Sequence, residues 1–549
     1  MADSSSLLAS ADTHVVTNQV PLLEDYNPAT SPALSEALIR EGGEWGIDEV
    51  HEVGALGGSR VAQRWGELAD RNVPILHTHD RYGHRVDEVE YDPAYHQLMN
   101  AAVTHGLHGA PWADDRPGAH VVRAAKMSAW TPEPGHVCPI SMTYAVVPAL
   151  RFNPELSKIY EPLLTSRVYD PELKVLATKA GITAGMSMTE KQGGSDVRAG
   201  TTQATPNGDG TYSLRGHKWF TSAPMGDMFL VLAQAPGGLS CFFLPRVLPD
   251  GTRNRMFIQR LKDKLGNHAN ASSEIEYDGA TVWLVGEEGR GVPTIIEMVN
   301  MTRLDCTLGS ATSMRTGLTQ AVHHAQHRKA FGAYLIDQPL MRNVLADMAV
   351  EAEAATMLAM RMAGATDRAV RGDERESLFR RIGLAAAKYW VCKRATPHAA
   401  EAMECFGGNG YAEESGMPRL YREAPLMGIW EGSGNVSALD TLRAIATKPE
   451  CVEVLFDELS QAQDPRLDAH VKALKAQLSD PQTLEYRGRK VSEDISLALQ
   501  GALLVRHGHP AVTEAFLASR LDRQWGGAFG TLPTGLDLAP IIERALVKG

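Results

Sequence analysis

The sequence predicts a multidomain α+β protein in which a β-domain lies between two helical domains and an extra helical unit follows. Three observations support this fold class. The chain has 549 residues, 44% of them hydrophobic, which is enough for about three or four domains. Residues 181–290 contain short apolar runs between turn signals, as strands do. The segments on either side repeat apolar residues at helical spacing.

The N-terminal part is predicted to contain an arm and a helical domain. Residues 1–45 are polar and rich in Pro, Ser and Asn, which favours an extended arm, a kind of segment that often covers a neighbour. Residues 46–180 include stretches with helical spacing, such as 92–100 and 142–150, separated by turns rich in Pro and Gly. We therefore expect a helical domain over residues 46–180.

The β-domain is predicted over residues 181–290. Its expected strands include residues 211–215, 229–233 and 239–244, and the Asn-Gly-Asp-Gly sequence at 207–210 is a strong turn signal. The last strand is expected to end near residues 282–285. The change from period 3.6 to short strand-like runs marks the domain boundary.

Two helical units are predicted after Gly291. Residues 291–450 form a bundle in which residues 385–395 are strong helix formers and Pro397 interrupts the helix. Residues 451–549 form the extra unit. Its leucines are expected on inner helix faces: Leu455, Leu459, Leu474, Leu478, Leu497, Leu499, Leu503 and Leu504.

Charge and composition narrow the function classes. The net charge of −12 gives no global reason to expect nucleic-acid binding, although local basic patches stay open. The six cysteines show no Cys-x-x-Cys pair and no zinc spacing, so we expect reduced core residues and no metal. Neither a signal peptide nor an apolar run of about 18 residues is present, which indicates a cytoplasmic protein without membrane contact.

Two short stretches carry the candidate chemistry. Residues 188–197 read Met-Thr-Glu-Lys-Gln-Gly-Gly-Ser-Asp-Val, where paired glycines and the hydroxyls of Thr189 and Ser195 suit phosphate and heterocycle edges. An ordinary Gly-Gly-Ser-Asp turn is the alternative. Residues 429–435 read Ile-Trp-Glu-Gly-Ser-Gly-Asn and place Glu431 between an apolar pair and a flexible turn, where a base could be desolvated. Alone, this stretch is only a loop.

The string at 188–197 resembles the flavin-binding signature of the acyl-CoA dehydrogenase superfamily, and the helical, β, helical order agrees with that fold. The resemblance implies FAD as cofactor and an acyl-CoA thioester as substrate. It assigns FAD contacts to Met188, Thr189, Gly194 and Ser195, with Ser195 also near the substrate.

A second matching segment follows at residues 216–222. By register, Phe220 lies over the flavin and Ser222 lies near its N5, where the family usually has Trp and Thr. Both substitutions keep the chemical type. Without the family, Trp219 and Phe220 would be interpreted as core strand residues.

Three further matches involve the helical bundle. Arg303 aligns with the family's buried arginine near the base, although unaided it could be the charged tip of a helix. Arg328 and Phe331 fall in an Arg-x-x-Phe-Gly element, whose arginine reaches the pyrophosphate of FAD held largely by another subunit. The family's Gln eight residues after that Phe is replaced here by Pro339.

The next match is a Gly-Gly-x-Gly-Tyr segment that also lines the partner's FAD. It places Gly407 and Gly408 against the cofactor, and the family's preceding Gln is Glu404 here. The plain alternative is a helix C-terminus with Gly punctuation.

The loop at 429–435 resembles the family's Tyr-Glu-Gly-Thr loop, so Glu431 falls on the catalytic base. Some members take the base from the residue before the buried arginine, but that residue is Thr302 here and cannot serve. The resemblance gives Glu431 the α-proton and flavin N5 the β-hydride. It places Trp430, Gly432, Ser433 and Asn435 at the cofactor.

Within the superfamily the arm, the two strings and the extra unit look most like the alkylation-response branch. Its members are FAD homotetramers that associate with DNA and have weak dehydrogenase activity. DNA binding through this C-terminal unit is less well supported, because the unit has eleven Lys/Arg and thirteen Asp/Glu. Local basic groups at 487–490 and 520–523 keep it open.

The sequence leaves three functions open. They are an acyl-CoA dehydrogenase, a DNA-associated flavoprotein with a vestigial site, and an oxidase that passes electrons to oxygen. Neither the acyl chain length nor the electron acceptor can be predicted.

Overall fold

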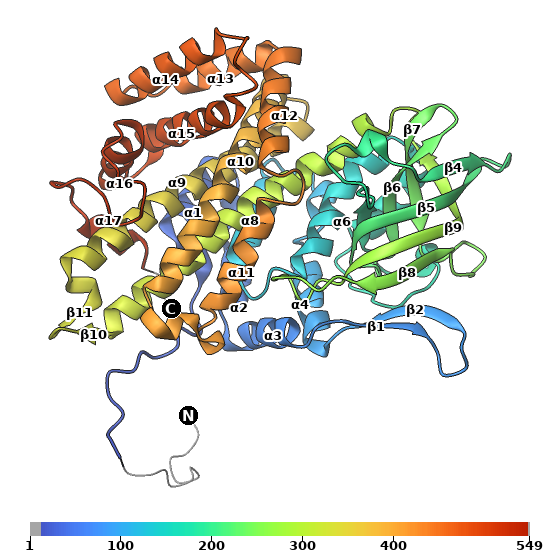
Figure 1. The fold of residues 1–549 in the computed structure, drawn as a ribbon, viewed down its shortest axis with the longest axis horizontal. Helices are drawn as coiled ribbons and strands as arrows, with labels where there is room; N and C mark the ends of the chain where they lie inside the picture. The colour runs from blue at the N-terminus through green and yellow to red at the C-terminus, as the bar shows by residue number, and fades with distance from the viewer. Residues whose placement is uncertain (1–12, 547–549) are drawn as a thin grey trace.

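The computed structural model describes residues 13–546 and has the predicted order of a helical domain, a β-domain, a helical bundle and a further helical unit. Figure 1 shows the β-domain on one side of the molecule and the long helices α8, α9 and α10 on the other. The C-terminal helices α13–α17 lie against the far side of that bundle. The predicted extended arm at residues 1–12 lies outside the described residues.

The β-domain is a seven-stranded sheet that closes on itself. The order is β3-β6-β4-β5-β9-β7, β6 also pairs with β7, and β8 pairs with β9. The predicted strands at 211–215, 229–233 and 239–244 are confirmed as parts of β5, β6 and β7. The strands are β3 Ala184–Ser187, β4 Gln203–Pro206, β5 Thr211–Ser222, β6 Met228–Ala235, β7 Gly238–Pro245, β8 Met256–Leu261 and β9 Ser272–Val285.

The N-terminal helical domain contains a hairpin that we did not predict. Strands β1 (Ile75–His79) and β2 (Arg85–Glu90) pair in antiparallel fashion, and Figure 1 shows them extending beneath the sheet. Leu76 and Val89 pack into the core of the β-domain, which explains why the segment is extended. The helices are α2 Ile47–Gly57, α3 Arg60–Arg71, α4 Pro93–Thr104, α5 Ala119–Ala129, α6 Val137–Leu150 and α7 Pro154–Leu164.

The predicted arm is wrong over part of its length. Helix α1 covers Pro32–Arg40 and buries Leu34, Ala37 and Leu38 in the core of the helical bundle. Pro32 occupies the first helical turn, where its missing N–H removes no hydrogen bond. Proline at this position starts a helix, so the proline-rich composition was a misleading sign of extended structure.

The bundle is formed by long helices that begin at Gly291. Helix α10 does not end at Pro397 as predicted but runs through it, because Ala395, His398 and Ala399 are buried on both sides of the proline. Packing therefore offsets the lost backbone hydrogen bond. The elements are α8 Gly291–His327, β10 Lys329–Ala330, β11 Ala333–Tyr334, α9 Pro339–Val370, α10 Glu374–Glu404, α11 Met417–Met427 and α12 Gly434–Thr447.

The C-terminal unit is helical as predicted and shares one core with the bundle. Seven of the eight predicted leucines are buried, and Leu478 is half-buried. The elements are α13 Glu450–Ser460, α14 Pro465–Leu478, α15 Gly488–His507, α16 Pro510–Phe516, the π-helical turn Leu517–Leu521 and α17 Ala539–Arg544.

Short 3₁₀ turns join several of these helices and strands. They are Pro28–Thr30, Glu44–Gly46, Ala110–Ala113, Leu176–Thr178, Val197–Ala199, Leu335–Asp337, Gly407–Tyr411 and Glu413–Ser415.

Two composition-based predictions can be compared with the structure. All six cysteines are unpaired and buried, as expected of reduced core residues. Among residues 13–546, no helix combines the length and the apolar character needed to cross a membrane.

Candidate active site

The candidate base lies in a strained loop between α11 and α12, residues 428–433. Glu431 has φ of 57° and Gly432 has φ of 105°. A left-handed conformation is uncommon for a residue with a side chain and persists only where the surroundings hold it. We call residues 428–433 the base loop.

Buried donors hold the base loop by its carbonyl groups. Lys388 of α10 is 1% exposed and donates from Nζ to the carbonyl of Trp430 at 2.9 Å and to that of Gly432. Arg303 of α8 donates from Nε to the carbonyl of Glu431 at 3.0 Å. Two cations therefore fix three successive peptide groups around the base.

The Glu431 carboxylate itself has one hydrogen bond among the described residues. Thr302 donates to Oε2 at 2.8 Å. Burial raises the pKa of Glu431, and the Thr302 hydroxyl and the charges of Lys388 and Arg303 partly oppose that rise. A carboxylate with a raised pKa is better suited to accept a carbon-bound proton near neutral pH.

The segment at 188–197 is fixed onto strand β5. The backbone N–H of Trp219 donates to the Thr189 carbonyl at 2.8 Å. The buried Lys218 donates from Nζ to the Met188 carbonyl at 3.2 Å. Lys218 also forms an ion pair with Glu190 at 2.8 Å. The segment and the second motif are therefore one structural unit.

Gly194 is required for this geometry. A Cβ added there would lie 2.3 Å from Oγ1 of Thr189, so any side chain would push the Thr189 hydroxyl away. Ser195 next to it is exposed. The glycine thus leaves room for the Thr189 hydroxyl against the backbone of the motif.

Phe220 and Ser222 are among the last three residues of β5. Phe220 is 50% exposed, so it is not the core residue that the alternative interpretation required. Asn270 donates to Oγ of Ser222 at 3.3 Å. Burial raises the pKa of the Cys138 thiol to about 12, Ser222 and Asn270 oppose that rise, and the Glu431 charge adds to it. Cys138 therefore lies near both Ser222 and Glu431.

Trp430 and Met188 also bring the first motif and the base loop together. Both side chains pack against the same hydrophobic cluster, built from α6, α8 and the β-domain. Nε1 of Trp430 is buried and has no hydrogen-bond partner among the described residues. A polar atom in that state leaves a donor available beside the base.

Arg303 is a buried residue inside α8 and not the charged tip of a helix. Its side chain is 6% exposed, and Nη1 forms an ion pair with Asp440 of α12 at 2.7 Å. The arginine thus links the base loop to the helix that follows it.

Four predicted cofactor residues lie far from Glu431 within the chain: Arg328, Phe331, Gly407 and Gly408. Helix α8 carries the chain from Thr302 to His327, roughly 38 Å at the helical rise. His324 stacks on Phe406 with ring centroids 4.4 Å apart, which places the ends of α8 and α10 together. We call these four residues the distal group.

The distal group is open to solvent. Phe331 is 99% exposed, and a Cβ added at Gly407 or Gly408 would meet nothing within 4 Å. Arg328 donates to the carbonyl of Asn18 at 2.6 Å, so it holds the N-terminal segment in this chain. As the plain alternative expected, a glycine lies just past the end of α10, because α10 ends at Glu404 and Gly407 starts the next turn.

The C-terminal unit makes a side-chain hydrogen bond to the start of α12, directly after the base loop. Arg489 of α15 donates to Oδ1 of Asn435 at 2.7 Å. Asn435 and Ser433 lie at the start of α12, where Ser433 makes no side-chain capping bond. Sequence patterns alone gave no reason to connect positions 435 and 489.

Most of the local basic groups in the C-terminal unit are already paired. Arg520 is buried and pairs with Asp347 at 2.6 Å, so it is not a surface group. Lys490 pairs with Asp494, and Arg487 pairs with Asp480 at 3.4 Å. These contacts reduce the positive charge available to an external phosphate.

Lys388, Asp440, Cys138 and Asn270 were missed by sequence reasoning. Lys388 had a usable signal, because it is a single lysine within the apolar run from Ile382 to Val391. A buried lysine needs acceptors, and the carbonyls of the base loop are those acceptors.

Three known protein domains match consecutive parts of the chain. The adaptive response protein AidB N-terminal domain matches residues 18–171, the acyl-CoA dehydrogenase middle domain matches 185–280, and the acyl-CoA dehydrogenase C-terminal domain matches 289–446. AidB of Escherichia coli is 44% identical over 94% of this chain and 95% of its own.

Two further similarities come from Caenorhabditis elegans. Acyl-CoA dehydrogenase family member 11 is 30% identical over 80% of this chain and 77% of its own. The crystal structure of ACDH-11 in complex with C11-CoA superposes with a TM-score of 0.84 at 28% identity, covering 95% of both chains. The chain belongs to the acyl-CoA dehydrogenase family and, by its N-terminal domain, to the AidB branch of that family.

Proposed function

We propose that this protein is an FAD-dependent acyl-CoA dehydrogenase that removes the α-proton of a thioester with Glu431. The observation that carries the proposal is the state of that carboxylate. It is held in a strained loop, it has one hydroxyl donor, and burial raises its pKa. A purely structural carboxylate at this place would be expected to pair with a cation, as Asp440 does.

The residues around the base loop fit a flavin. Phe220 offers a half-exposed aromatic face, Trp430 offers an unpartnered indole N–H, and Gly194 lets the Thr189 hydroxyl approach closely. Met188 and Ser222, from the same two motifs, would also contact the flavin. When bound, FAD would supply the acceptor for the hydride that leaves the β-carbon.

The chain's own residues would perform the acid–base part of the reaction. Glu431 accepts the α-proton, and Thr302 orients its Oε2. The Glu431 N–H has no acceptor among residues 13–546, so it is available to the thioester carbonyl, where it would stabilise the enolate-like charge. Lys388 and Arg303 would hold that N–H in place through the neighbouring carbonyls.

The substrate class follows from the family and one relative. The Caenorhabditis elegans ACDH-11 structure is a complex with C11-CoA. We propose an acyl-CoA of fatty acid metabolism as substrate for this chain, without assigning a chain length. Ser195 is exposed at the edge of the first motif and would contact the CoA side.

We further propose a homotetramer in which FAD is shared between subunits. The distal group lies roughly 38 Å along α8 from the base, so one chain cannot place both around one cofactor. The exposure of Phe331 and the open Gly407 and Gly408 support a role toward a neighbouring subunit's FAD. There, Arg328 would exchange its contact with Asn18 for the pyrophosphate.

The proposal is tested by Glu431→Gln. We expect the variant to keep its FAD and to lose flavin bleaching on anaerobic mixing with acyl-CoA by at least about 1,000-fold, because an amide cannot accept the proton. The control is Glu287→Gln, which changes an exposed carboxylate before α8. Bleaching retained in Glu431→Gln would show that another group is the base.

The electron acceptor is addressed with the wild-type protein and a panel of acyl-CoA thioesters. Turnover with an artificial acceptor and slow reoxidation by oxygen would support the dehydrogenase. Rapid reoxidation by oxygen would instead support an oxidase. The same panel ranks the acyl chains.

A DNA-associated flavoprotein with weak dehydrogenase activity is the alternative function. The pairing of Arg520, Lys490 and Arg487 with carboxylates makes this alternative the weaker one. A salt-dependent mobility shift with duplex DNA, together with no turnover on any thioester, would reverse the ranking.

A further inference from the structure

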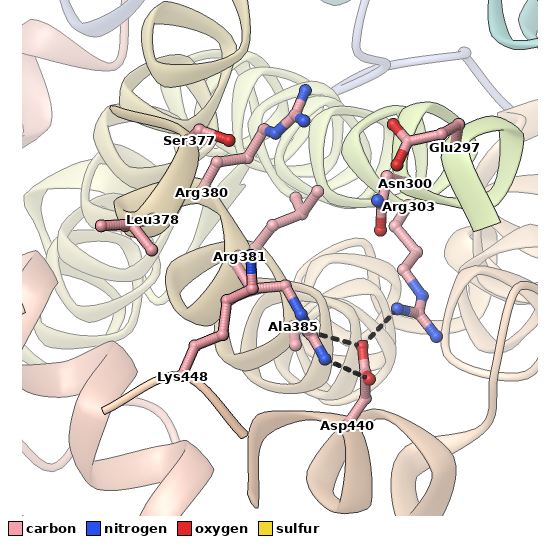
Figure 2. Close-up of a pocket in the computed structure, with 11 residues that line it drawn as sticks. Glu297, Asn300, Arg303, Ser377, Leu378, Arg380, Arg381, Ala385, Asp440 and Lys448 are labelled. Atoms are coloured by element: carbon pink, nitrogen blue, oxygen red, sulfur yellow. Dashed lines mark hydrogen bonds and ion pairs between the residues drawn. The ribbon is translucent and has the colours of Figure 1, made fainter. Parts of the chain in front are cut away.

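A polar cavity lies along a face of α8 that neighbours the face in contact with the base. It has a volume of about 150 Å³ and lies between α8, α10 and α12. Figure 2 shows Arg303 and Arg381 converging on Asp440 at one side of it, whereas Arg380 and Glu297 lie on the α8 side. Ser377 and Lys448 are exposed and form its mouth. We call it the rear cavity.

The rear cavity is separate from the candidate active site. Glu297, Asn300 and Arg303 recur every third residue of α8 and share one face. Thr302, which contacts Glu431, projects about 100° away from Arg303 around the helix. A ligand in the rear cavity would therefore not compete with a thioester at Glu431.

Cations outnumber carboxylates in the rear cavity. Its lining includes the four cations Arg303, Arg380, Arg381 and Lys448 but only the two carboxylates Glu297 and Asp440. Asp440 is already shared, accepting from Arg303 at 2.7 Å and from Arg381 at 2.9 Å. The remaining charge of the lining is two positive units.

Arg380 provides the observation that points to a ligand. Its Nη1 atom is buried and has no hydrogen-bond partner, and no ion pair to this residue exists within the described chain. Burial lowers the pKa of Arg380, and the Glu297 charge only partly opposes that effect. Leaving a buried guanidinium donor unsatisfied is costly, so an anion that fills the cavity would be stabilising.

We propose that the rear cavity binds a phosphate dianion. A phosphate matches the excess of two positive charges, and its oxygens accept in the geometry that a guanidinium fork presents. The volume is several times what one water needs, which leaves space for a tetrahedral anion. Lys448 at the mouth would neutralise the outer oxygens. The phosphate is either free or the end of a small phosphomonoester.

The test is isothermal titration of the FAD-bound full-length protein with inorganic phosphate at constant ionic strength in chloride. We expect saturable binding in the wild type. Arg380→Gln should weaken it by at least about tenfold, because a charged hydrogen bond is lost. Lys448→Gln should weaken it by a smaller factor. The matched control is Arg375→Gln on the same helix, whose exposed side chain pairs with Asp457 at 3.1 Å, and it should bind as the wild type does.

A second arm separates the two sources of phosphate. Binding of inorganic phosphate alone identifies a free ion, and additional binding of glycerol 3-phosphate identifies a monoester; both support the site. If Arg380→Gln does not fold, the phosphate affinities of Arg380→Lys and Lys448→Gln are compared with that of the wild type instead. No saturation by about 10 mM phosphate, or equal affinity in all variants, would overturn the proposal.

Discussion

Glu431 and Asp440 are two carboxylates joined to the same arginine, yet they are in opposite states. Arg303 donates Nε to the backbone carbonyl of Glu431 and Nη1 to the carboxylate of Asp440. Burial would raise both pKa values. At Asp440 the charges of Arg303 and Arg381 reverse that effect and lower the pKa, whereas at Glu431 the raised pKa persists.

The difference shows how one cation can support two roles. Directing the guanidinium at a carboxylate creates a structural ion pair, and directing it at a carbonyl fixes the backbone while leaving the acid free to titrate. Pairs of acids whose pKa values are driven apart are typical of acid–base sites. Arg303 therefore connects a structural ion pair, at Asp440, to the proposed chemistry, at Glu431.

The largest expected effect comes from removing the structural charge. Asp440→Asn leaves the buried Arg303 and the half-buried Arg381 without their shared carboxylate, and breaking a buried pair such as Arg303–Asp440 costs about 3–5 kcal/mol. Urea unfolding would measure the loss. The control is Asp457→Asn, which removes an exposed carboxylate paired with Arg375 and should cost under about 1 kcal/mol. Equal losses in the two variants would show that Asp440 has no special role.

A smaller effect on stability, with a larger one on the reaction, is expected from Lys388→Met. The variant deletes the donor to the Trp430 and Gly432 carbonyls, so we expect a loss of about 2 kcal/mol in unfolding free energy. The base would shift within its loop, and a displacement near 1 Å can slow a reaction about 100-fold. Flavin reduction by acyl-CoA in a stopped-flow instrument measures this rate.

Lys393→Met is the matched control for Lys388. Lys393 is exposed on the same helix and makes no hydrogen bond to a base-loop carbonyl. Its flavin reduction should stay within about twofold of the wild type. A Lys388→Met variant that is equally fast would mean that Arg303 alone positions the loop.

The contrast between these residues also shows what sequence could predict. The domain order and the Glu431 candidate followed from motifs and the family resemblance that they carry, because strand patterns and the base loop are local in the chain. Lys388 lies 42 positions before Trp430, and Asp440 lies 9 positions after Glu431. Both support the loop through contacts that exist only after α10 and α12 pack. No single-sequence pattern states which buried charges will meet.

Two of the three errors in the fold had the same origin. The passage of α10 through Pro397 depends on burial against distant helices, which overrides local propensity. The β1–β2 hairpin is extended because Leu76 and Val89 complete the core of a domain about 100 residues away. Helix α1 differs, because Pro32 in its first turn is a local helix signal that the proline-rich composition obscured.

The smallest effect is expected from removing the hydrogen bond between Thr302 and the Glu431 carboxylate. Thr302→Val removes the hydroxyl that donates to Glu431 at 2.8 Å and keeps the side-chain shape. Because that bond lowers the pKa of Glu431 against the rise caused by burial, its loss should raise the pKa further. The base is active when deprotonated, so the acidic limb of the rate profile should move to higher pH.

The size of this effect is set by one hydrogen bond. At a pH below the pKa of Glu431 the rate of flavin reduction should fall by about fivefold, corresponding to about 1 kcal/mol. Well above that pH the two proteins should differ less, because Glu431 is then ionised in both. Thr302→Ser restores the hydroxyl and should restore the profile. An acidic limb that stays in place in Thr302→Val, or moves to lower pH, would mean that the Thr302 hydroxyl does not stabilise the ionised base, and Arg303 and Lys388 would then be its principal support.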